Sequence, residues 1–210
     1  MKRFTDRDKA IIGFIEKHKI VNSNQLKRLF GITDATLSRR MKFITENSEV
    51  KKFRYNPQIN FYDNKYKELI PNNNCYYWKR KPTNIMHTLL VNEVYLYLKE
   101  RFDIIDFELE HVIQYEDFIV RADIYFSFRY NGREWDYLIE VENNKGFNYS
   151  KYLKLEEGGI ILPKIIVLTD RRIYNKTKYE VIKARLNLSD LENKVKQDII
   201  EQDFGYKIKG

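Results

Sequence analysis

The chain has 210 residues, of which 43% are hydrophobic and 32% charged, with only 8 glycines and 4 prolines. This composition is typical of a folded protein with one large or two small domains, and it excludes a disordered or low-complexity chain. No apolar run approaches the ~20 residues that cross a bilayer, and charged residues interrupt the N-terminal stretch where a secretory signal would stand. The single cysteine, Cys75, excludes an internal disulfide, and three scattered histidines do not make a usual zinc site. We therefore expect a cytoplasmic protein with no membrane partner.

Positive charge is concentrated in the first part of the chain. Residues 1–82 contain 19 Lys and Arg against 8 Asp and Glu, whereas residues 83–210 contain 19 against 22. A basic segment of this kind is typical of a surface that binds a polyanion. We therefore expect the first third of the chain to bind nucleic acid.

The first 47 residues predict three helices. Thr5 and Asn22 are N-caps for the first two helices, Gly31 ends the second, and Thr33 caps the third. The third helix carries one apolar stripe, made of Leu37, Met41 and Ile44. Helix, short helix, tight turn and helix is the order of a helix-turn-helix motif.

Two strand-like segments, 49–55 and 58–62, follow the third helix around a turn at Asn56-Pro57. Residues 4–63 thus resemble a winged-helix DNA-binding domain, which implies that the third helix enters the major groove of double-stranded DNA. The expected DNA contacts are polar residues off the apolar stripe and basic residues of the wing: Thr36, Arg39, Arg40, Lys42, Lys51, Lys52 and Arg54. The alternative is that these residues are ordinary solvated charges.

Residues 64–82 break the periodicity and predict a linker between the domain at 1–63 and a second domain at 83–210. Within the linker, Tyr76-Tyr77-Trp78 precedes Lys79-Arg80-Lys81. Such a mixture can stack on unpaired bases, but exposed aromatic clusters more often pack against protein. We favour the packing interpretation.

From Thr83 onward the patterns predict a mixed β-sheet with helices on both faces, so the fold class is α+β or α/β. The expected elements, in order, are a helix over 83–102, a strand over 104–115, a hairpin that turns at Asn131-Gly132, a helix over 149–157, a buried strand over 164–170, a helix over 171–186, and a last helix capped by Ser189.

Three carboxylates stand among apolar residues of the predicted hairpin: Asp123, Glu140 and Glu142. A buried carboxylate is costly unless a positive group meets it. Glu140 and Glu142 are two residues apart and share a strand face, and Asp123 can join them across the hairpin. Convergence of this kind favours a divalent cation with oxygen ligands. The alternative is a solvated face whose carboxylates pair with Lys145 or Lys151.

This part of the chain resembles the PD-(D/E)xK nuclease fold in the order of its elements: a strand with Asp123, a turn, a strand with Glu140 and a helix with Lys151. That resemblance implies a restriction-endonuclease-like sheet in residues 83–210, with Mg²⁺ bound by Asp123 and Glu140. Glu142 stands where the motif has its Lys, so Lys151 from the next helix is the candidate replacement. The catalytic candidates are therefore Asp123, Glu140, Glu142 and Lys151.

Taken together, the segments are also similar to the replication-relaxation family of plasmid and conjugative-element proteins. The matching positions are His87, Val91-Asn92, Asp123, Glu140 with Glu142, and Lys151-Tyr152. The chain departs from the family at Glu142, where an Asp is usual, and at Asn143-Asn144-Lys145, where Arg-Gly-Thr is usual. The resemblance implies DNA handling in replication, relaxation or transfer of a mobile element, with other replication or transfer proteins or a second copy of the chain as partners.

Three functions follow as hypotheses. The first is a sequence-specific double-stranded DNA-binding protein of a plasmid or other mobile element. The second is a Mg²⁺-dependent DNA endonuclease that uses Asp123 and Glu140. The third is a winged-helix transcriptional repressor whose C-terminal domain senses a ligand or a protein.

Overall fold

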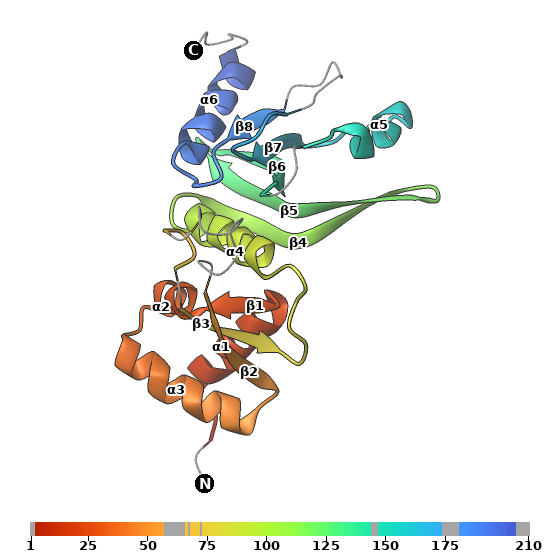
Figure 1. The fold of residues 1–210 in the computed structure, drawn as a ribbon. Helices are drawn as coiled ribbons and strands as arrows, with labels where there is room; N and C mark the ends of the chain where they lie inside the picture. The colour runs from red at the N-terminus through yellow and green to blue at the C-terminus, as the bar shows by residue number, and fades with distance from the viewer. Residues whose placement is uncertain are drawn as a thin grey trace. The chain divides into compact units, whose positions relative to one another are not determined.

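The computed structural model of the chain describes residues 3–56, 66, 68–71, 73–143, 147–173 and 181–204. It confirms a mixed α+β fold, with one three-stranded antiparallel sheet and one five-stranded mixed sheet (Figure 1). The chain divides into two compact units, Met1–Leu96 and Tyr97–Gly210, and each unit holds one of the sheets. The division falls inside helix α4 (Ile85–Lys99), later in the chain than the linker expected at 64–82.

The three predicted helices of the first unit are present, with the predicted caps. They are α1 (Asp6–Lys17), α2 (Ser23–Phe30) and α3 (Asp34–Asn47). The side chains of Thr5, Asn22 and Thr33 each accept a hydrogen bond from a backbone N–H in the first turn. Gly31 follows α2 with a φ of 58°, a left-handed conformation that favours glycine. Local sequence signals therefore set where these helices begin and end.

The first sheet has the strand order β1-β3-β2, and both pairs are antiparallel. Its strands are β1 (Ile20–Asn22), β2 (Val50–Tyr55) and β3 (Asn73–Trp78). The partner of β2 is therefore β3, which lies in the segment predicted to be a linker, whereas the predicted wing strand at 58–62 lies outside the described residues. Tyr76 belongs to the core that α1, α2 and α3 form with this sheet, which explains why 73–78 is ordered as a strand.

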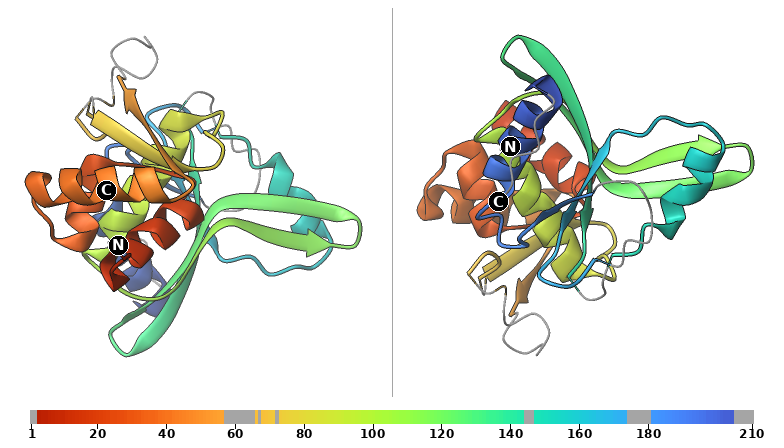
Figure 2. Two further views of the ribbon diagram at one scale, coloured as in Figure 1. Left: turned by 90° about the horizontal axis from the view of Figure 1, so that it is seen from below. Right: turned by 90° about the horizontal axis from the view of Figure 1, so that it is seen from above.

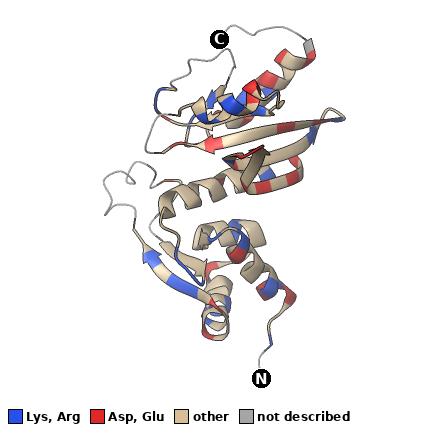
Figure 3. Ribbon diagram, turned by 90° about the vertical axis from the view of Figure 1, so that its right-hand side faces the viewer, with Lys and Arg blue, Asp and Glu red and all other residues tan. Residues whose placement is uncertain are grey.

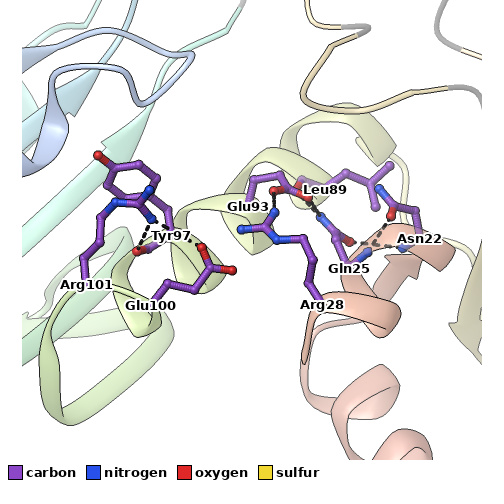
Figure 4. A network of polar contacts seen from close by, with 8 residues as sticks. All are labelled: Asn22, Gln25, Arg28, Leu89, Glu93, Tyr97, Glu100 and Arg101. Carbon is purple, nitrogen blue, oxygen red and sulfur yellow. Dashed lines mark hydrogen bonds and ion pairs between the residues drawn. The ribbon is translucent and has the colours of Figure 1, made fainter. Parts of the chain in front are cut away.

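The N-terminal part of α4 joins the first unit through buried polar contacts (Figure 4). Gln25 donates from Nε2 to the carbonyl of Leu89 and to Oε1 of Glu93, at 2.9 Å each. Arg28 forms an ion pair with the other oxygen of Glu93 at 2.5 Å. A buried charge of this kind is tolerated because it has both a cation and a hydrogen-bond donor. At the other end of α4, within the second unit, the guanidinium of Arg101 stacks on Tyr97 at 3.8 Å.

A second buried contact joins α4 to the end of α1. Nδ1 of His18 lies 2.8 Å from Oδ1 of Asn92, and Nδ2 of Asn92 donates to the carbonyl of Ile20 at 2.6 Å. Because Asn92 uses its amide N–H on Ile20, its oxygen faces His18, so Nδ1 of a neutral imidazole is the donor. The ring of His18 also stacks on Phe14 at 3.9 Å.

The second unit is built on a sheet with the strand order β4-β5-β6-β7-β8. β4, β5 and β6 pair antiparallel, and β7 and β8 continue the sheet in parallel. Asn131 and Gly132 turn the β5–β6 hairpin with φ of 51° and 77°, as predicted. The bounds are β4 (Asp103–Tyr115), β5 (Phe118–Tyr130), β6 (Arg133–Val141), β7 (Lys164–Leu168) and β8 (Ile182–Ala184).

Two helices cover opposite faces of this sheet. α5 (Ser150–Glu157) packs Tyr152 and Leu155 against Leu138 of β6, whereas α6 (Leu191–Phe204) accepts a hydrogen bond from the hydroxyl of Tyr137 through Asp198. Because Tyr137 and Leu138 are consecutive strand residues, their side chains point to opposite faces. Figure 2 shows the β4–β5 hairpin extending beyond the other strands, with α5 beside its outer part.

The prediction of a helix over 171–186 is wrong in the second half of that range, because residues 182–184 form the strand β8. β8 pairs in parallel with β7 from Ile166 to Leu168, so the sheet gains an edge strand. Residues 174–180 lie outside the described part of the chain. No helix in the part of the chain that the structure describes is both long enough and apolar enough to cross a membrane.

Acidification should destabilise the first unit through His18. Burial, with a smaller effect of Lys17, lowers the pKa of His18 from 6.5 to about 4, although the contact with Asn92 opposes the shift. Between these values the unfolded chain binds a proton and the folded chain does not, so stability is complete above pH 6.5 and falls by roughly 3 kcal/mol as the pH approaches 4.

The measurement is denaturant unfolding at several pH values, followed by the fluorescence of Trp78 in a Trp135→Phe background, because each unit holds one of the two tryptophans. His18→Gln should remove most of the decline between pH 6.5 and 4. An equally steep decline in that variant would show that another group causes it.

Candidate functional site

Asp123 and Glu140 come together where the β5–β6 hairpin opens. The paired register of these strands ends at Ile124 and Ile139, so Asp123 and Glu140 are the next residues on each strand. Oδ2 of Asp123 accepts a hydrogen bond from the backbone N–H of Val141 at 2.8 Å. Asp123 therefore provides the acceptor for the backbone N–H of Val141. The carboxylates of Asp123 and Glu140 are close enough to interact electrostatically.

Glu140 lies in a buried environment with two donors on one oxygen. It is only 2% exposed, and its Oε1 accepts a hydrogen bond from the hydroxyl of Tyr152 and an ion pair from Nζ of Lys151 at 2.6 Å. Lys151 also donates to the carbonyl of Arg121 at 3.1 Å. No hydrogen bond to the second oxygen, Oε2, comes from any residue that the structure describes. One oxygen is thus held in place and the other remains available as a ligand.

The environment of Glu140 raises the pKa of its carboxyl. Burial and, to a smaller extent, the negative charge of Asp123 raise the pKa of Glu140 from 4.5 to about 7, against the opposing effects of Lys151 and Tyr152. The same burial and the neighbouring Glu140 carboxylate raise the pKa of Tyr152, so its phenol stays protonated and donates to Glu140. A carboxyl that titrates near neutrality in a cluster of this kind is a candidate functional group.

Glu142 is the residue that follows the last residue of β6, Val141. Its backbone N–H donates to Leu168 at 2.9 Å, and its carbonyl accepts from Oγ1 of Thr169 at 3.0 Å. In the described parts of the chain, no three His, Cys, Asp or Glu residues form a group that could hold a metal ion. Glu142 therefore does not complete a three-carboxylate site with Asp123 and Glu140.

The donor set at Asp123 and Glu140 nevertheless fits Mg²⁺. This ion is usually held by one or two carboxylates together with water and substrate phosphates, and a cage made only of protein ligands is not required. Two facing carboxylates, one with Oε2 available, meet that requirement. Asp123, Glu140 and Lys151, all expected from the sequence, are brought together, whereas Tyr152 entered only through the family resemblance. No spacing rule identifies Tyr152, because residues 142–149 separate β6 from α5 in the chain and no repeating pattern relates the two elements.

The basic residues expected to contact DNA divide into two groups. Arg39 and Lys42 of α3 are exposed, as are Lys51, Lys52 and Arg54 of β2, and Thr36 is partly exposed near the start of α3. Arg40 is different because its guanidinium forms a two-pronged ion pair with Asp8, which is 0% exposed. Arg40 thus links α3 to the N-terminal turn of α1, a structural role that its position in the sequence does not reveal.

The pairing of Arg40 with Asp8 is stable as an ion pair. Burial alone would raise the pKa of Asp8, but hydrogen bonds from Arg40 and Thr5 outweigh it and lower the pKa. Asp8 also accepts from the backbone N–H of Thr5, so one carboxylate closes the capping box of α1 and neutralises Arg40. Arg40 is therefore the residue of the predicted set least suited to contact a ligand.

The positive surface of the first unit is concentrated on β2 and β3. Residues 50–55 and 73–82 contain six Lys and Arg and no Asp or Glu. Figure 3 shows the basic residues gathered along β2. These side chains are exposed: Lys51, Lys52 and Arg54 on β2, and Lys79, Arg80 and Lys81 in the segment that follows β3. Such a basic surface attracts a polyanion.

Comparison of the chain with protein-family models, with curated proteins and with solved structures finds no match. The resemblances to the replication-relaxation family and to PD-(D/E)xK nucleases remain predictions.

Replacement of Glu140 should stabilise the second unit at neutral and alkaline pH. Because its folded pKa of about 7 exceeds the unfolded value of 4.5, stability is complete below pH 4.5 and is lost as the pH rises toward 7. Glu140→Gln retains an oxygen acceptor for Tyr152 and does not ionise, so it should exceed wild type by roughly 3 kcal/mol above pH 7 and match it near pH 4.5.

Denaturant unfolding followed by Trp135 fluorescence in a Trp78→Phe background measures this difference. Asp136→Asn is the matched control, since Asp136 is an exposed carboxylate on the same strand. A difference between wild type and Glu140→Gln that is independent of pH would contradict the assignment.

Proposed function

We propose that the first unit binds double-stranded DNA as a winged-helix domain. The observation that carries this proposal is the element order α1-β1-α2-α3-β2-β3 combined with the strand order β1-β3-β2, which is a helix-turn-helix followed by a short antiparallel sheet. In this arrangement α3 is the recognition helix. Its buried residues Leu37, Met41 and Ile44 face the core, which leaves Arg39 and Lys42 exposed on its other side.

The distribution of charge supports the same proposal. A helix that reads bases needs a side chain such as Arg, which donates two hydrogen bonds to guanine, and flanking cations that contact phosphates. Arg39 supplies the first, and Lys52 and Arg54 on β2 supply the second. The assignment excludes Arg40, because a DNA contact would require breaking its ion pair with buried Asp8.

Arg39→Ala and Lys52→Ala should weaken duplex binding in different ways. Loss of Arg39 should cost about 1–3 kcal/mol at one base pair of the preferred site and reduce discrimination there. Loss of Lys52 should weaken binding to all duplexes equally and reduce the slope of log K against log salt by about one unit. Selection of a preferred duplex from a random pool, followed by titrations at several salt concentrations, provides the measurement.

Arg40→Ala is the structural control for these variants. It leaves Asp8 buried without its cation, so it should lower the free energy of unfolding of the first unit. Wild-type affinity, preference and salt dependence in both Arg39→Ala and Lys52→Ala would show that α3 and β2 do not contact DNA.

We propose a second activity for the second unit, Mg²⁺-dependent cleavage of DNA. The observation that favours it is the convergence of Asp123, Glu140 and Lys151 at the end of a β5–β6 hairpin. The order α4-β4-β5-β6-α5-β7, with β7 parallel to β6, is also the order of helices and strands in the PD-(D/E)xK fold that the sequence resembles. Lys151 comes from α5 and takes the place of the lysine that the strand lacks at Glu142.

The residues of the second unit have distinct roles in this proposal. Asp123 and Oε2 of Glu140 would hold the ion, which when bound polarises the phosphodiester and stabilises its developing negative charge. Tyr152 positions Glu140 through Oε1. Lys151 is the cation of the site and, once Glu140 is occupied by the ion, can position water and the phosphate. The ion also offsets the repulsion between DNA and a domain in which acidic residues outnumber basic ones.

A nicking assay on supercoiled DNA with Mg²⁺ or Mn²⁺ tests this activity. Wild type should convert supercoiled DNA to open-circular or linear forms, and Asp123→Asn or Glu140→Gln should lower the rate at least 100-fold, because each removes a charged ligand while keeping its shape. Glu134→Gln, at an exposed carboxylate on β6, is the control. Absence of cleavage by wild type, or equal rates in all four proteins, would refute the nuclease assignment and leave the duplex-binding proposal intact.

The biological setting that the resemblance implies is a plasmid or other mobile element. Within it, we propose sequence-specific binding at an origin of replication or transfer. Footprinting on the DNA adjacent to the coding sequence distinguishes this setting from a repressor, since a repressor protects its own promoter.

A further inference from the structure

The outward face of the β2–β3 strand pair carries aromatic side chains that duplex binding does not use. Val50 and Tyr76 belong to the core that the sheet forms with α1, α2 and α3. Because side chains alternate along a strand, Lys51, Phe53 and Tyr77 point to the opposite face of the sheet. Phe53 and Tyr77 are partly exposed, and Lys51 is exposed. We call Lys51, Phe53, Tyr77 and the adjacent Lys81 the outward face.

The four side chains of the outward face form one continuous surface. The ring centroids of Phe53 and Tyr77 are 5.9 Å apart, with the ring planes inclined at 68°. Lys51 is the cross-strand partner of Tyr77, and Nζ of Lys81 lies 4.4 Å from the centroid of Phe53. Phe53 therefore has an ammonium group over its ring, and Tyr77 has a lysine directly across the strand pair, on strands that carry no carboxylate.

This combination differs from what a duplex requires. In a duplex the faces of the bases are covered by neighbouring bases, so a protein reaches only their edges and the phosphates. Aromatic side chains gain nothing from phosphates, but they stack on unpaired bases of any sequence while nearby cations contact the backbone. Cys75 and Tyr55 on the same face are buried, so packing explains that part of it, whereas Lys51 is exposed and Phe53 and Tyr77 are partly exposed.

We propose that the outward face binds single-stranded nucleic acid, with unpaired bases stacked on Phe53 and Tyr77 and the phosphates beside them contacted by Lys51 and Lys81. This inference rests on the proposed nucleic-acid binding of the first unit and extends it to unpaired strands. α3 packs on the other face of the same sheet, so Arg39 and the outward face serve different ligands. A protein with both surfaces recognises DNA in which duplex and single strand adjoin.

Fluorescence anisotropy of the full chain with three labelled probes tests the proposal: oligothymidine, oligouridine and the preferred duplex. Phe53→Leu and Tyr77→Leu should raise the Kd for oligothymidine about tenfold or more, because each removes one stacking ring, and leave the Kd for the duplex within about twofold. Tyr77→Phe keeps the ring and should bind as wild type does. Lys81→Gln should reduce the salt slope for oligothymidine by about 0.7.

Two controls separate the surfaces. Arg39→Ala should weaken duplex binding and leave oligothymidine binding unchanged, and Lys9→Gln, which removes an exposed charge on α1, should change neither. Near-UV circular dichroism checks that the leucine variants fold. If Tyr77→Leu does not fold, Phe53→Leu and the salt slope of Lys81→Gln still test the proposal.

The outcomes have separate consequences. Oligothymidine binding that is absent in wild type, or unaffected by the loss of either ring, overturns the inference even if the duplex binds. Loss of duplex binding alone overturns only the proposed winged-helix function. Comparable affinity for oligouridine identifies the ligand as any single strand, and a preference for oligothymidine identifies it as DNA, since the two probes differ at the 2′-hydroxyl and at the thymine methyl group.

Discussion

The desolvation of Glu140 is the constraint on which the organisation of the second unit depends. β6 lies between β5 and β7, so a carboxylate at this position has protein on both sides and cannot turn toward bulk water. Replacing a buried charge with an apolar side chain of similar size is often neutral or stabilising. The preceding residues of β6, from Tyr137 to Ile139, are uncharged and buried. If stability alone decided the residue at position 140, an apolar side chain would be expected there as well. The groups that meet Glu140 are instead three residues drawn from two elements: Asp123 on β5, and Lys151 and Tyr152 on α5, which follows β6 in the chain.

In the first unit, each of the buried charged groups Asp8 and Glu93 has a cation as its partner. Asp8 is neutralised by Arg40, and Glu93 by Arg28 with Gln25. His18 and Asn92 satisfy each other and the carbonyl of Ile20. These polar pairs join helices to one another and to the N-terminal part of α4. They are readily explained as structural contacts that fix one arrangement of α1, α2, α3 and α4. The exposed cations of this unit include Lys51, Lys52 and Arg54 on β2 and the three basic residues 79–81 that follow β3.

The two proposed functions use different chemistry toward one kind of ligand. Exposed Lys and Arg attract a phosphodiester backbone, and a divalent cation held by carboxylates would stabilise the negative charge that develops when the backbone is cleaved. Among the described residues, the exposed cations of β2 and of residues 79–81 lie in the first unit, and Asp123 and Glu140 lie in the second. The proposals therefore place binding and cleavage on different sheets, and they divide binding between the α3 surface for paired strands and the outward face for unpaired strands.

The sequence alone determined the features that depend on neighbours along the chain. The caps at Thr5, Asn22 and Thr33, the left-handed Gly31, the Asn131-Gly132 turn and the apolar strand at Lys164–Leu168 all follow from interactions over a few residues. The convergence of Asp123, Glu140 and Lys151 was predictable because a two-residue turn sets the register of a hairpin and the next helix follows closely.

Only the tertiary structure decided the pairings between distant segments. Three features depend on burial against elements far away in the sequence. They are the pairing of β2 with β3, the ion pair between Arg40 and Asp8 at a separation of 32 residues, and the strand at Ile182–Ala184. A segment such as Asn73–Trp78 has no periodic pattern of its own. It becomes a strand because both of its neighbours offer unpaired backbone groups and because the core needs Tyr76, and these conditions exist only after the helices have packed.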